Sequence, residues 1–311
     1  MKILINRKIV QGPWGGGNNF VKSFHDSLLS SHQIVYDLSH NDIDLIVMID
    51  PRYDDCGISI NEIFAYKQKN PKVKILHRIN ECDARKNTND IDKLLLASNK
   101  IADETVFISE WLRDYFIERG FNKKNHVIYN GCNTSHFYPL KNPENKTIDN
   151  PIKIVTHHWS DNWMKGFDVY RYLDQLCEKN PEKYQFTYIG RYAKEYIPKH
   201  TIVIPPKSGK ELGDELRKHD IYITASRWEP CGMHHIEGAA SGLPVIYHTE
   251  GGGIVEGCKN HGLSFRNVEE IPERLEDVKR SYKKLISKID YQFLSSDRCV
   301  SRYLDIVNSM I

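Results

Sequence analysis

The chain lacks the sequence features of several protein classes. Its longest apolar runs, such as residues 45–49, have the length of a buried strand, so no segment is expected to cross a bilayer. Its seven cysteines are scattered without a Cys-x-x-Cys spacing, which argues against a zinc site and against a disulfide framework. The first residues lead straight into a predicted strand and show no signal-peptide pattern. We therefore expect reduced thiols in a cytoplasmic protein.

The sequence also has little net charge. Its 43 basic and 41 acidic residues give a formal charge of +2. A dedicated nucleic-acid binder, or a protein strongly attracted to a membrane, would carry a clear excess of basic residues. Neither class fits this composition.

No group of residues has a convincing metal-site spacing. Two Asp-x-Asp sequences occur at 42–44 and 90–92, but the first leads into a buried strand and the second starts a helix. The histidine pairs at 157–158 and 234–235 are adjacent in sequence, and adjacent residues do not face one metal from a helix. We expect neither a metal ion nor another cofactor.

Short β-rich runs alternate with helical patterns along the whole chain, which predicts an α/β protein with parallel sheets and right-handed crossovers. The predicted strands span residues 2–5, 33–36, 44–49, 73–78, 104–108, 126–129, 152–156, 185–190, 201–204, 221–225, 244–247 and 263–265. The predicted helices span residues 18–30, 58–69, 89–102, 109–119, 167–179, 208–218, 233–241 and 270–289.

The alternation breaks once, at residues 139–151, where three prolines and polar residues indicate a linker. The chain length suits about two domains. We therefore predict doubly wound domains at 1–140 and 151–295, followed by a helix over 296–311. Two such domains would leave a cleft between the carboxyl ends of their sheets, where these folds bind ligands.

The most informative segment runs from Glu229 to Glu237. It follows the buried strand predicted at 221–225 and contains a Pro-Cys-Gly turn that opens a short helix, which Gly242 stops. Free backbone N–H groups at such a helix start can hold a phosphate. Carboxylates on either side of an anion site suit a ligand with sugar hydroxyls on both sides of a phosphate, as in a nucleotide sugar. A solvent-facing helix start with acidic residues is the plain alternative.

This segment resembles the donor site of the family 4 retaining glycosyltransferases, which have the two-domain GT-B fold. Their signature is two glutamates separated by seven residues, followed by small residues and a Gly-x-Pro-Val sequence. Here the glutamates are Glu229 and Glu237, and the tail is residues 238–246. The resemblance implies that Glu229 contacts the donor sugar hydroxyls and Glu237 the ribose. It also implies that the final helix crosses back onto the first domain.

The resemblance extends to a Lys-Gly motif after the first strand of the second domain. It implies that Lys165, with the backbone amides of Gly232 and Met233, neutralises the donor diphosphate and stabilises the leaving group. It also suggests that His234 approaches the sugar. An arginine that relatives carry a few residues before the lysine is absent, and Arg191 is a possible substitute. The alternative for the lysine is a surface residue before a capping turn.

Two motifs of the first domain belong to the same comparison. Residues 12–19 form a glycine-rich turn between a strand and a helix, and Gly15, Gly16 and Gly17 resemble the loop that faces the donor phosphates and the acceptor. His77 lies near the end of a strand, where relatives place a histidine close to the acceptor. A plain strand-to-helix connection and a satisfied structural histidine are the alternatives.

These features favour a metal-independent, retaining, hexosyltransferase-type enzyme that moves a sugar from a nucleoside-diphosphate sugar to an acceptor hydroxyl. The acceptor is open among a glycan, a lipid-linked sugar, a small molecule and, less favoured by the charge, a modified DNA base. Two other functions fit the same binding residues: a nucleotide-sugar epimerase of the same fold, and a non-catalytic module that binds sugar nucleotides or glycans.

Overall fold

The computed structural model describes residues 1–12, 15–52 and 54–310. The chain forms two compact units. The first consists of Met1–Asn130 and the segment from Ser296 onward, and the second is Gly131–Ser295. Within the described residues, no helix is both long enough and apolar enough to span a membrane.

The units meet in sequence at Asn130 and Gly131, whereas we predicted that the first domain ends at residue 140. The intervening segment is held by the second unit. The Cys132 amide donates to the Leu294 carbonyl over 2.8 Å, and the Arg217 guanidinium donates to the His136 carbonyl over 3.0 Å.

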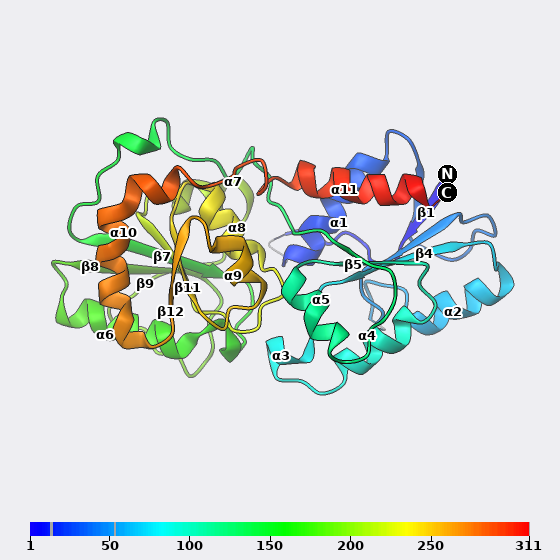
Figure 1. Ribbon diagram of the computed structural model, residues 1–311, viewed down its shortest axis with the longest axis horizontal. Helices are drawn as coiled ribbons and strands as arrows, with labels where there is room; N and C mark the ends of the chain where they lie inside the picture. Colours follow the sequence, from blue (N-terminus) through cyan, green and yellow to red (C-terminus); the bar gives the residue numbers. More distant parts are fainter. Residues whose placement is uncertain (13–14, 53, 311) are drawn as a thin grey trace. The chain divides into compact units, whose positions relative to one another are not determined.

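A parallel six-stranded sheet forms the centre of the first unit. Its order is β2 (Gln33–Val35), β1 (Lys2–Ile5), β3 (Leu45–Met48), β4 (Lys74–Ile79), β5 (Glu104–Phe107) and β6 (His126–Val127). The helices are α1 (Gly16–Leu28), α2 (Ile60–Lys69), α3 (Asp83–Lys86), α4 (Ile91–Asn99), α5 (Glu110–Ile117) and α11 (Ser296–Ser309). Figure 1 labels β1, β4, β5 and the helices of this unit.

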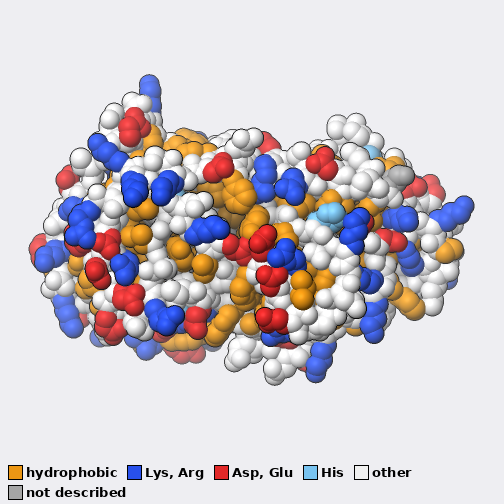
Figure 2. Space-filling model, in the orientation of Figure 1, with side chains coloured by type: hydrophobic (Ala, Val, Ile, Leu, Met, Phe, Trp, Pro, Cys, Tyr) orange, Lys and Arg blue, Asp and Glu red, His pale blue; other side chains and the backbone are white. Residues whose placement is uncertain are grey.

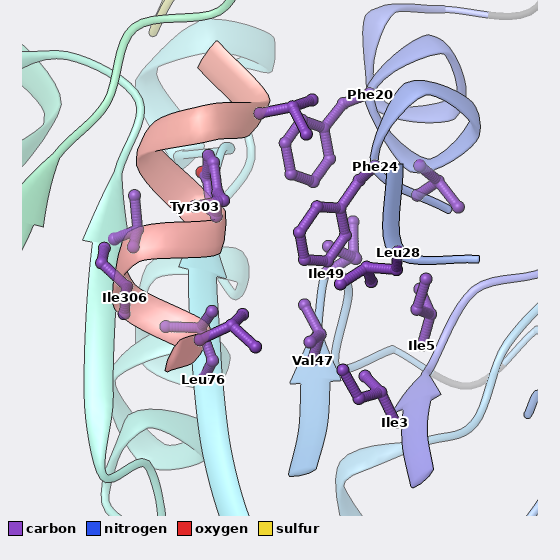
Figure 3. Packing of buried hydrophobic residues seen from close by; sticks show 14 of the residues in the cluster. Ile3, Ile5, Phe20, Phe24, Leu28, Val47, Ile49, Leu76, Tyr303 and Ile306 are labelled. Carbon is purple, nitrogen blue, oxygen red and sulfur yellow. The ribbon is translucent and has the colours of Figure 1, made fainter. Parts of the chain in front are cut away.

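Helix α11, although last in the sequence, packs in the first unit against α1. Phe20 and Phe24 recur at helical spacing on α1 and are buried. The Tyr303 ring of α11 lies with its centroid 4.8 Å from that of Phe20 and 5.8 Å from that of Phe24. Figure 3 shows these rings together above Val47 and Leu76 of the sheet. The C-terminal segment thus completes the core of the first unit.

A second parallel six-stranded sheet forms the centre of the other unit. Its order is β12 (Gly262–Phe265), β11 (Val245–His248), β10 (Ile221–Thr224), β7 (Ile152–His158), β8 (Tyr184–Gly190) and β9 (Ile202–Ile204). The helices are α6 (Phe167–Lys179), α7 (Gly209–Leu216), α8 (Met233–Ala240), α9 (Gly253–Cys258) and α10 (Ile271–Ile286). The 3₁₀ turns are η1 (Pro143–Asn145), η2 (Trp163–Lys165) and η3 (Val268–Glu270).

Each predicted strand and each predicted long helix is present, so the α/β class and the two doubly wound sheets are confirmed. Two short helices escaped the sequence analysis. Helix α3 has four residues, too few for a periodic pattern. Helix α9 follows Gly251 and Gly252, and the positive φ of Gly252 directs the chain into the helix.

The strand order creates one switch point in each sheet. In the second unit the chain passes from β7 to β8 and β9 on one side, and then returns to place β10 on the other side of β7. In the first unit the same change of direction separates β1 from β3. Ligands of open α/β sheets bind beyond the carboxyl ends of the strands at such points. The surface around these sheets has mixed charge, with basic and acidic side chains interspersed over the face shown in Figure 2.

Candidate functional site

The switch point of the second sheet brings together residues that lie far apart in sequence. Strand β7 leads through η2 to Lys165, and strand β10 leads to Glu229. Their side chains form a hydrogen-bonded ion pair across 64 residues of sequence. Both are buried, with 7% of Lys165 and 3% of Glu229 exposed. A buried ion pair depends strongly on both partners, because removing one leaves an uncompensated charge.

The loop that carries Glu229 is fixed to the Lys-Gly segment. The Arg227 amide donates to the Met164 carbonyl over 3.0 Å. The Arg227 guanidinium also makes two hydrogen bonds to the Asp168 carboxylate, at 3.0 and 2.7 Å. Burial alone would raise the pKa of Asp168, but the hydrogen bonds and charge of Arg227 hold it below its ordinary value. These contacts fix the segment that carries Lys165 relative to the loop that carries Glu229.

The other side of the same loop is fixed to the segment before α9. The Trp228 amide donates to the Glu250 carbonyl over 2.8 Å, and the Glu229 carbonyl accepts from the Gly253 amide over 2.9 Å. Trp228 has a φ of 49°, in the left-handed region that a bulky residue rarely adopts. Strain of this kind is retained where surrounding contacts determine the backbone, and it is common at functional sites.

Helix α8 begins directly after this loop, with Gly232 as its N-cap and Met233 as its first residue. A Cβ atom added to Gly232 would lie 2.5 Å from the His234 ring and 3.1 Å from Glu229 Cγ. A larger residue would therefore displace both side chains. The first-turn amides of α8 begin beside the Lys165–Glu229 pair, and a helix start of this kind is suited to an anion.

Neutral histidines surround the ion pair. His158 Nε2 lies 2.7 Å from the Tyr170 hydroxyl, and His234 Nε2 lies 2.9 Å from Thr224 Oγ1. Burial, and to a smaller extent the charge of Lys165, hold the pKa of His158 well below its ordinary value. The pKa of His234 is lowered in the same way, by burial and then by His158 and Lys165. These imidazoles are therefore polar contacts and not additional cations.

The second glutamate of the motif lies on α8 and meets a residue that the sequence analysis left without a role. Glu237 Oε2 is 2.8 Å from His157 Nε2, and both residues are buried. His157 Nδ1 is in turn 3.1 Å from the Tyr222 hydroxyl. From the sequence, His157 was considered only as a member of the adjacent histidine pair 157–158. The signal that could have found it is its place at the carboxyl end of β7, at the switch point.

Arg191, the suggested substitute for the missing arginine, follows β8. Its side chain is exposed, pairs with Asp161 over 3.1 Å and lies 5.2 Å from the Trp159 ring centroid. The structure therefore directs its guanidinium toward these two residues. A role in holding a diphosphate stays a prediction.

His77 belongs to the first unit, inside β4. Its side chain has no exposed surface and lies beside Asn99 of α4, whose amide nitrogen is 3.0 Å from His77 Nδ1. Burial lowers the pKa of His77 to about 3. This environment is that of an enclosed, neutral histidine.

Gly15, Gly16 and Gly17 also belong to the first unit, where Gly15 caps α1 and the other two form its first turn. The neighbouring Pro13 and Trp14 of the glycine-rich turn lie outside the described residues. Asn18 fixes the start of the helix through two hydrogen bonds with the backbone of Val10, at 2.8 and 2.9 Å.

Paired arginines that the sequence analysis did not single out gather at the carboxyl edge of the first sheet. Arg52, after β3, makes hydrogen bonds of 2.6 to 3.1 Å to Asp50, and Arg7, after β1, lies 3.6 Å from the same carboxylate. After β4, Arg85 pairs with Glu81 over 3.0 Å. The switch point of this sheet is thus lined by charged groups that could contact a polar ligand.

Across the described ranges, no three His, Cys, Asp or Glu side chains are arranged to hold a metal ion. The residues of this site comprise a buried ammonium, two buried carboxylates and the amides of a helix start.

Comparison with known sequences finds similarity over most of the second unit. Residues 163–290 match the sequence profile described as Glycosyl transferases group 1. A probable sucrose-phosphate synthase of Thermosipho melanesiensis is 28% identical over 201 residues, which cover 58% of this chain and 46% of that protein. A mannosylfructose-phosphate synthase of Agrobacterium fabrum is 26% identical over 182 residues, covering 49% and 38%. The chain thus spans less than half the length of both curated relatives.

Comparison with solved structures shows the fold of the whole chain. Anabaena HepE in complex with UDP-glucose superposes with a TM-score of 0.78, covering 99% of this chain and 100% of that one at 12% identity. A sucrose-phosphate synthase from Thermosynechococcus elongatus has a TM-score of 0.73, covering 99% and 98% at 14% identity. The predicted GT-B architecture is therefore confirmed.

Proposed function

We propose that this protein is a glycosyltransferase that moves a sugar from a nucleoside-diphosphate sugar to an acceptor hydroxyl, with retention of the anomeric configuration. The observation that carries the proposal is the buried Lys165–Glu229 pair at the start of α8, with Glu237 on the same helix. The ends of β7 and β10 and the start of α8 thus bring together a cation, two carboxylates and anion-binding amides.

Each group has a place in the proposed reaction. The diphosphate is held by the Lys165 ammonium and by the first amides of α8, so the charge that develops on the leaving group is stabilised. Glu229 accepts hydrogen bonds from the donor sugar, and Glu237 from the ribose. When the diphosphate replaces Glu229 as the ion-pair partner of Lys165, the Glu229 carboxylate stays beside the ammonium. It can then accept hydrogen bonds from the sugar hydroxyls. The site therefore needs no metal ion in this proposal.

The acceptor proton goes to the leaving phosphate, on the face from which the acceptor approaches. The histidine suggested for the first domain, His77, is enclosed within its own unit and is neutral, so it offers no exposed base. The carboxylates assigned to the site hold hydroxyl groups. Departure of the diphosphate and arrival of the acceptor on one face give retention.

The names of related proteins set the order of substrates to test. HepE is described in complex with UDP-glucose, and both curated relatives are named for making a phosphorylated disaccharide. We therefore propose UDP-sugars as the first donors and sugar phosphates as the first acceptors. The paired arginines at the first sheet's carboxyl edge suit a polar or anionic acceptor.

A two-step experiment tests the proposal. A thermal-shift screen against nucleoside diphosphates and their sugars should identify a donor, because a ligand that binds the folded state raises the unfolding temperature. Transfer is then measured with that donor and a panel of acceptors, with Glu229→Gln as the inactive control. Absence of stabilisation by every nucleotide would overturn the proposal.

The same experiment separates the two alternative functions. An epimerase would convert the donor alone into an isomeric nucleotide sugar, without an acceptor. A binding module would be stabilised by the nucleotide sugar but would leave it intact with every acceptor.

A further inference from the structure

We infer that His157 is a positioning residue that holds Glu237 in the orientation that recognises the ribose of the nucleotide, and that Tyr222 holds His157 in turn. The inference rests on the proposed function. It adds a residue from β7 and a residue from β10 to a recognition so far assigned to Glu237 alone. It also predicts that these hydrogen bonds affect recognition of the ribose hydroxyls of the nucleotide.

The three side chains form a continuous hydrogen-bonded series within the second unit. The Glu237 Oε2 atom is 2.8 Å from His157 Nε2, and His157 Nδ1 is 3.1 Å from the Tyr222 hydroxyl. All three residues are at least nine-tenths buried. In a site of low polarity such hydrogen bonds are stronger than in water, and an unpaired polar group is costly.

The available protons define the direction of the series. The Tyr222 hydroxyl accepts from the backbone N–H of His157 over 3.2 Å, so its own proton is left to donate. Its nearer acceptor is His157 Nδ1 at 3.1 Å, since the His157 carbonyl is 3.4 Å away. His157 then carries its proton on Nε2 and donates it to Glu237. The pKa of Tyr222 is raised well above its ordinary value by burial, so the hydroxyl keeps its proton at neutral pH.

The series is held on rigid elements. Tyr222 lies in β10 and pairs with Val155 of β7, two residues before His157. The Tyr222 ring packs against α8 so closely that a Cβ atom on Gly238 would lie 2.5 Å from it. Glu237 is the neighbour of that glycine. A small displacement of the ring or of the imidazole would therefore be transmitted to the carboxylate.

The two carboxylate oxygens of Glu237 therefore have different roles. Oε2 accepts from His157, whereas Oε1 accepts no hydrogen bond from the described residues. A carboxylate fixed through one oxygen presents the other in one direction and can accept from a ribose hydroxyl there. Removing the ribose hydroxyl from the nucleotide should therefore weaken binding as much as removing the contact that orients the Glu237 carboxylate.

A matched pair of variants tests this role. In His157→Gln the side-chain amide can place its nitrogen where Nε2 lies and still donate to Glu237. In His157→Asn the amide is too short to reach it. Tyr222→Phe removes only the hydroxyl that orients the imidazole. His261→Asn, at another buried histidine of the same unit, is the control for loss of a buried imidazole.

The readout is the ratio of dissociation constants for 2′-deoxy and 3′-deoxy forms of the best-binding nucleoside diphosphate relative to the parent compound. Calorimetry on wild-type protein should give a ratio of about tenfold or more for at least one deoxy form, as for a hydrogen bond to a charged group. His157→Gln and His261→Asn should keep that ratio. His157→Asn should reduce it to about threefold or less, and Tyr222→Phe should give an intermediate value.

The outcomes separate this inference from the function on which it rests. Binding by wild type with the ratio unchanged in His157→Asn and Tyr222→Phe would overturn the positioning role and leave the proposed function standing. Equal loss of the ratio in the Gln and Asn variants would also overturn it, because the role requires a donor at Nε2. Failure of wild type to bind any nucleoside diphosphate would overturn both. If His157→Asn does not fold, Tyr222→Phe decides alone.

Discussion

The ammonium of Lys165 and the carboxylate of Glu229 meet inside the second unit, although one residue ends a 3₁₀ turn after β7 and the other follows β10. Each is the other's counter-charge in a place where a lone charge would be strongly disfavoured. The same two groups are the ones that the proposed reaction uses on the diphosphate and on the sugar. The Lys165–Glu229 contact therefore matters both for stability and for the proposed reaction.

Removing either member of this pair should destabilise the protein, and removing the second member as well should add less than its own single effect. Lys165→Met and Glu229→Gln should each lower the free energy of unfolding by about 3–5 kcal/mol, because each removes the ion-pair partner of a buried charge. The double variant should be less destabilised than the sum of the two. Urea unfolding gives the three values, and strict additivity would show that the groups do not interact. All three variants should be inactive in transfer.

Nucleotide affinity should depend on Glu237. A hydrogen bond to a charged group contributes about 1.5–3 kcal/mol, so Glu237→Ala should weaken binding of the nucleoside diphosphate about tenfold or more. Calorimetry measures the change. Glu178→Ala, which removes an exposed carboxylate from α6, is the control and should bind as wild type does. An unchanged affinity in Glu237→Ala would remove the ribose role.

Transfer should continue in excess EDTA. Lys165 and the amides of α8 carry the diphosphate charge in the proposed mechanism, so no divalent cation is required. The assay should detect the product directly, since coupling enzymes can themselves need metal ions. Complete loss on chelation, with recovery in Mn²⁺ or Mg²⁺, would contradict the proposed chemistry.

The product should keep the anomeric configuration of the donor. An α-linked nucleotide sugar should give an α-linked product, because the acceptor arrives on the face that the diphosphate leaves. Proton NMR of the first-formed product decides this through the anomeric coupling constant. A β-linked product would mean inversion and would require a general base outside the residues assigned here.

Acid should destabilise the first unit through His77. Its folded pKa is about 3, against about 6.5 in the unfolded chain, so the unfolded state binds an extra proton as the pH falls below about 6.5. The free energy of unfolding should therefore fall by up to about 1.4 kcal/mol per pH unit from this group, until the pH approaches the folded pKa. His77→Gln should show a shallower slope between pH 6 and pH 4. Ile75→Val should shift the whole curve in parallel, and equal slopes in wild type and His77→Gln would exclude the effect.

Much of the fold was accessible from the sequence because parallel strands buried on both faces give short continuous apolar runs. Leu45 to Met48 and Ile221 to Thr224 are such runs, and both are strands. Helix α8 was equally clear, since Gly232 precedes it and Gly242 follows its end. The extra helices were missed because one is very short and the other follows glycines.

The contacts of the site were less accessible, because they depend on the order of strands in the sheet. Only that order places β7 beside β10 and so brings Lys165 to Glu229. The roles of adjacent histidines were hidden for a related reason. Successive residues of a strand point in different directions, so His157 contacts Glu237 of α8 whereas His158 contacts the Tyr170 hydroxyl of α6 and the His234 ring.

The position of α11 has a consequence for how the protein is made. Its side chains, Tyr303 among them, fill the core beside Phe20 and Phe24, yet the ribosome delivers them only after the whole second unit. The second unit is continuous in sequence and can be completed while that core is still open. We expect the half of the protein that is synthesised first to be the half that finishes folding last, with its aromatic residues exposed in the meantime to chaperones and proteases.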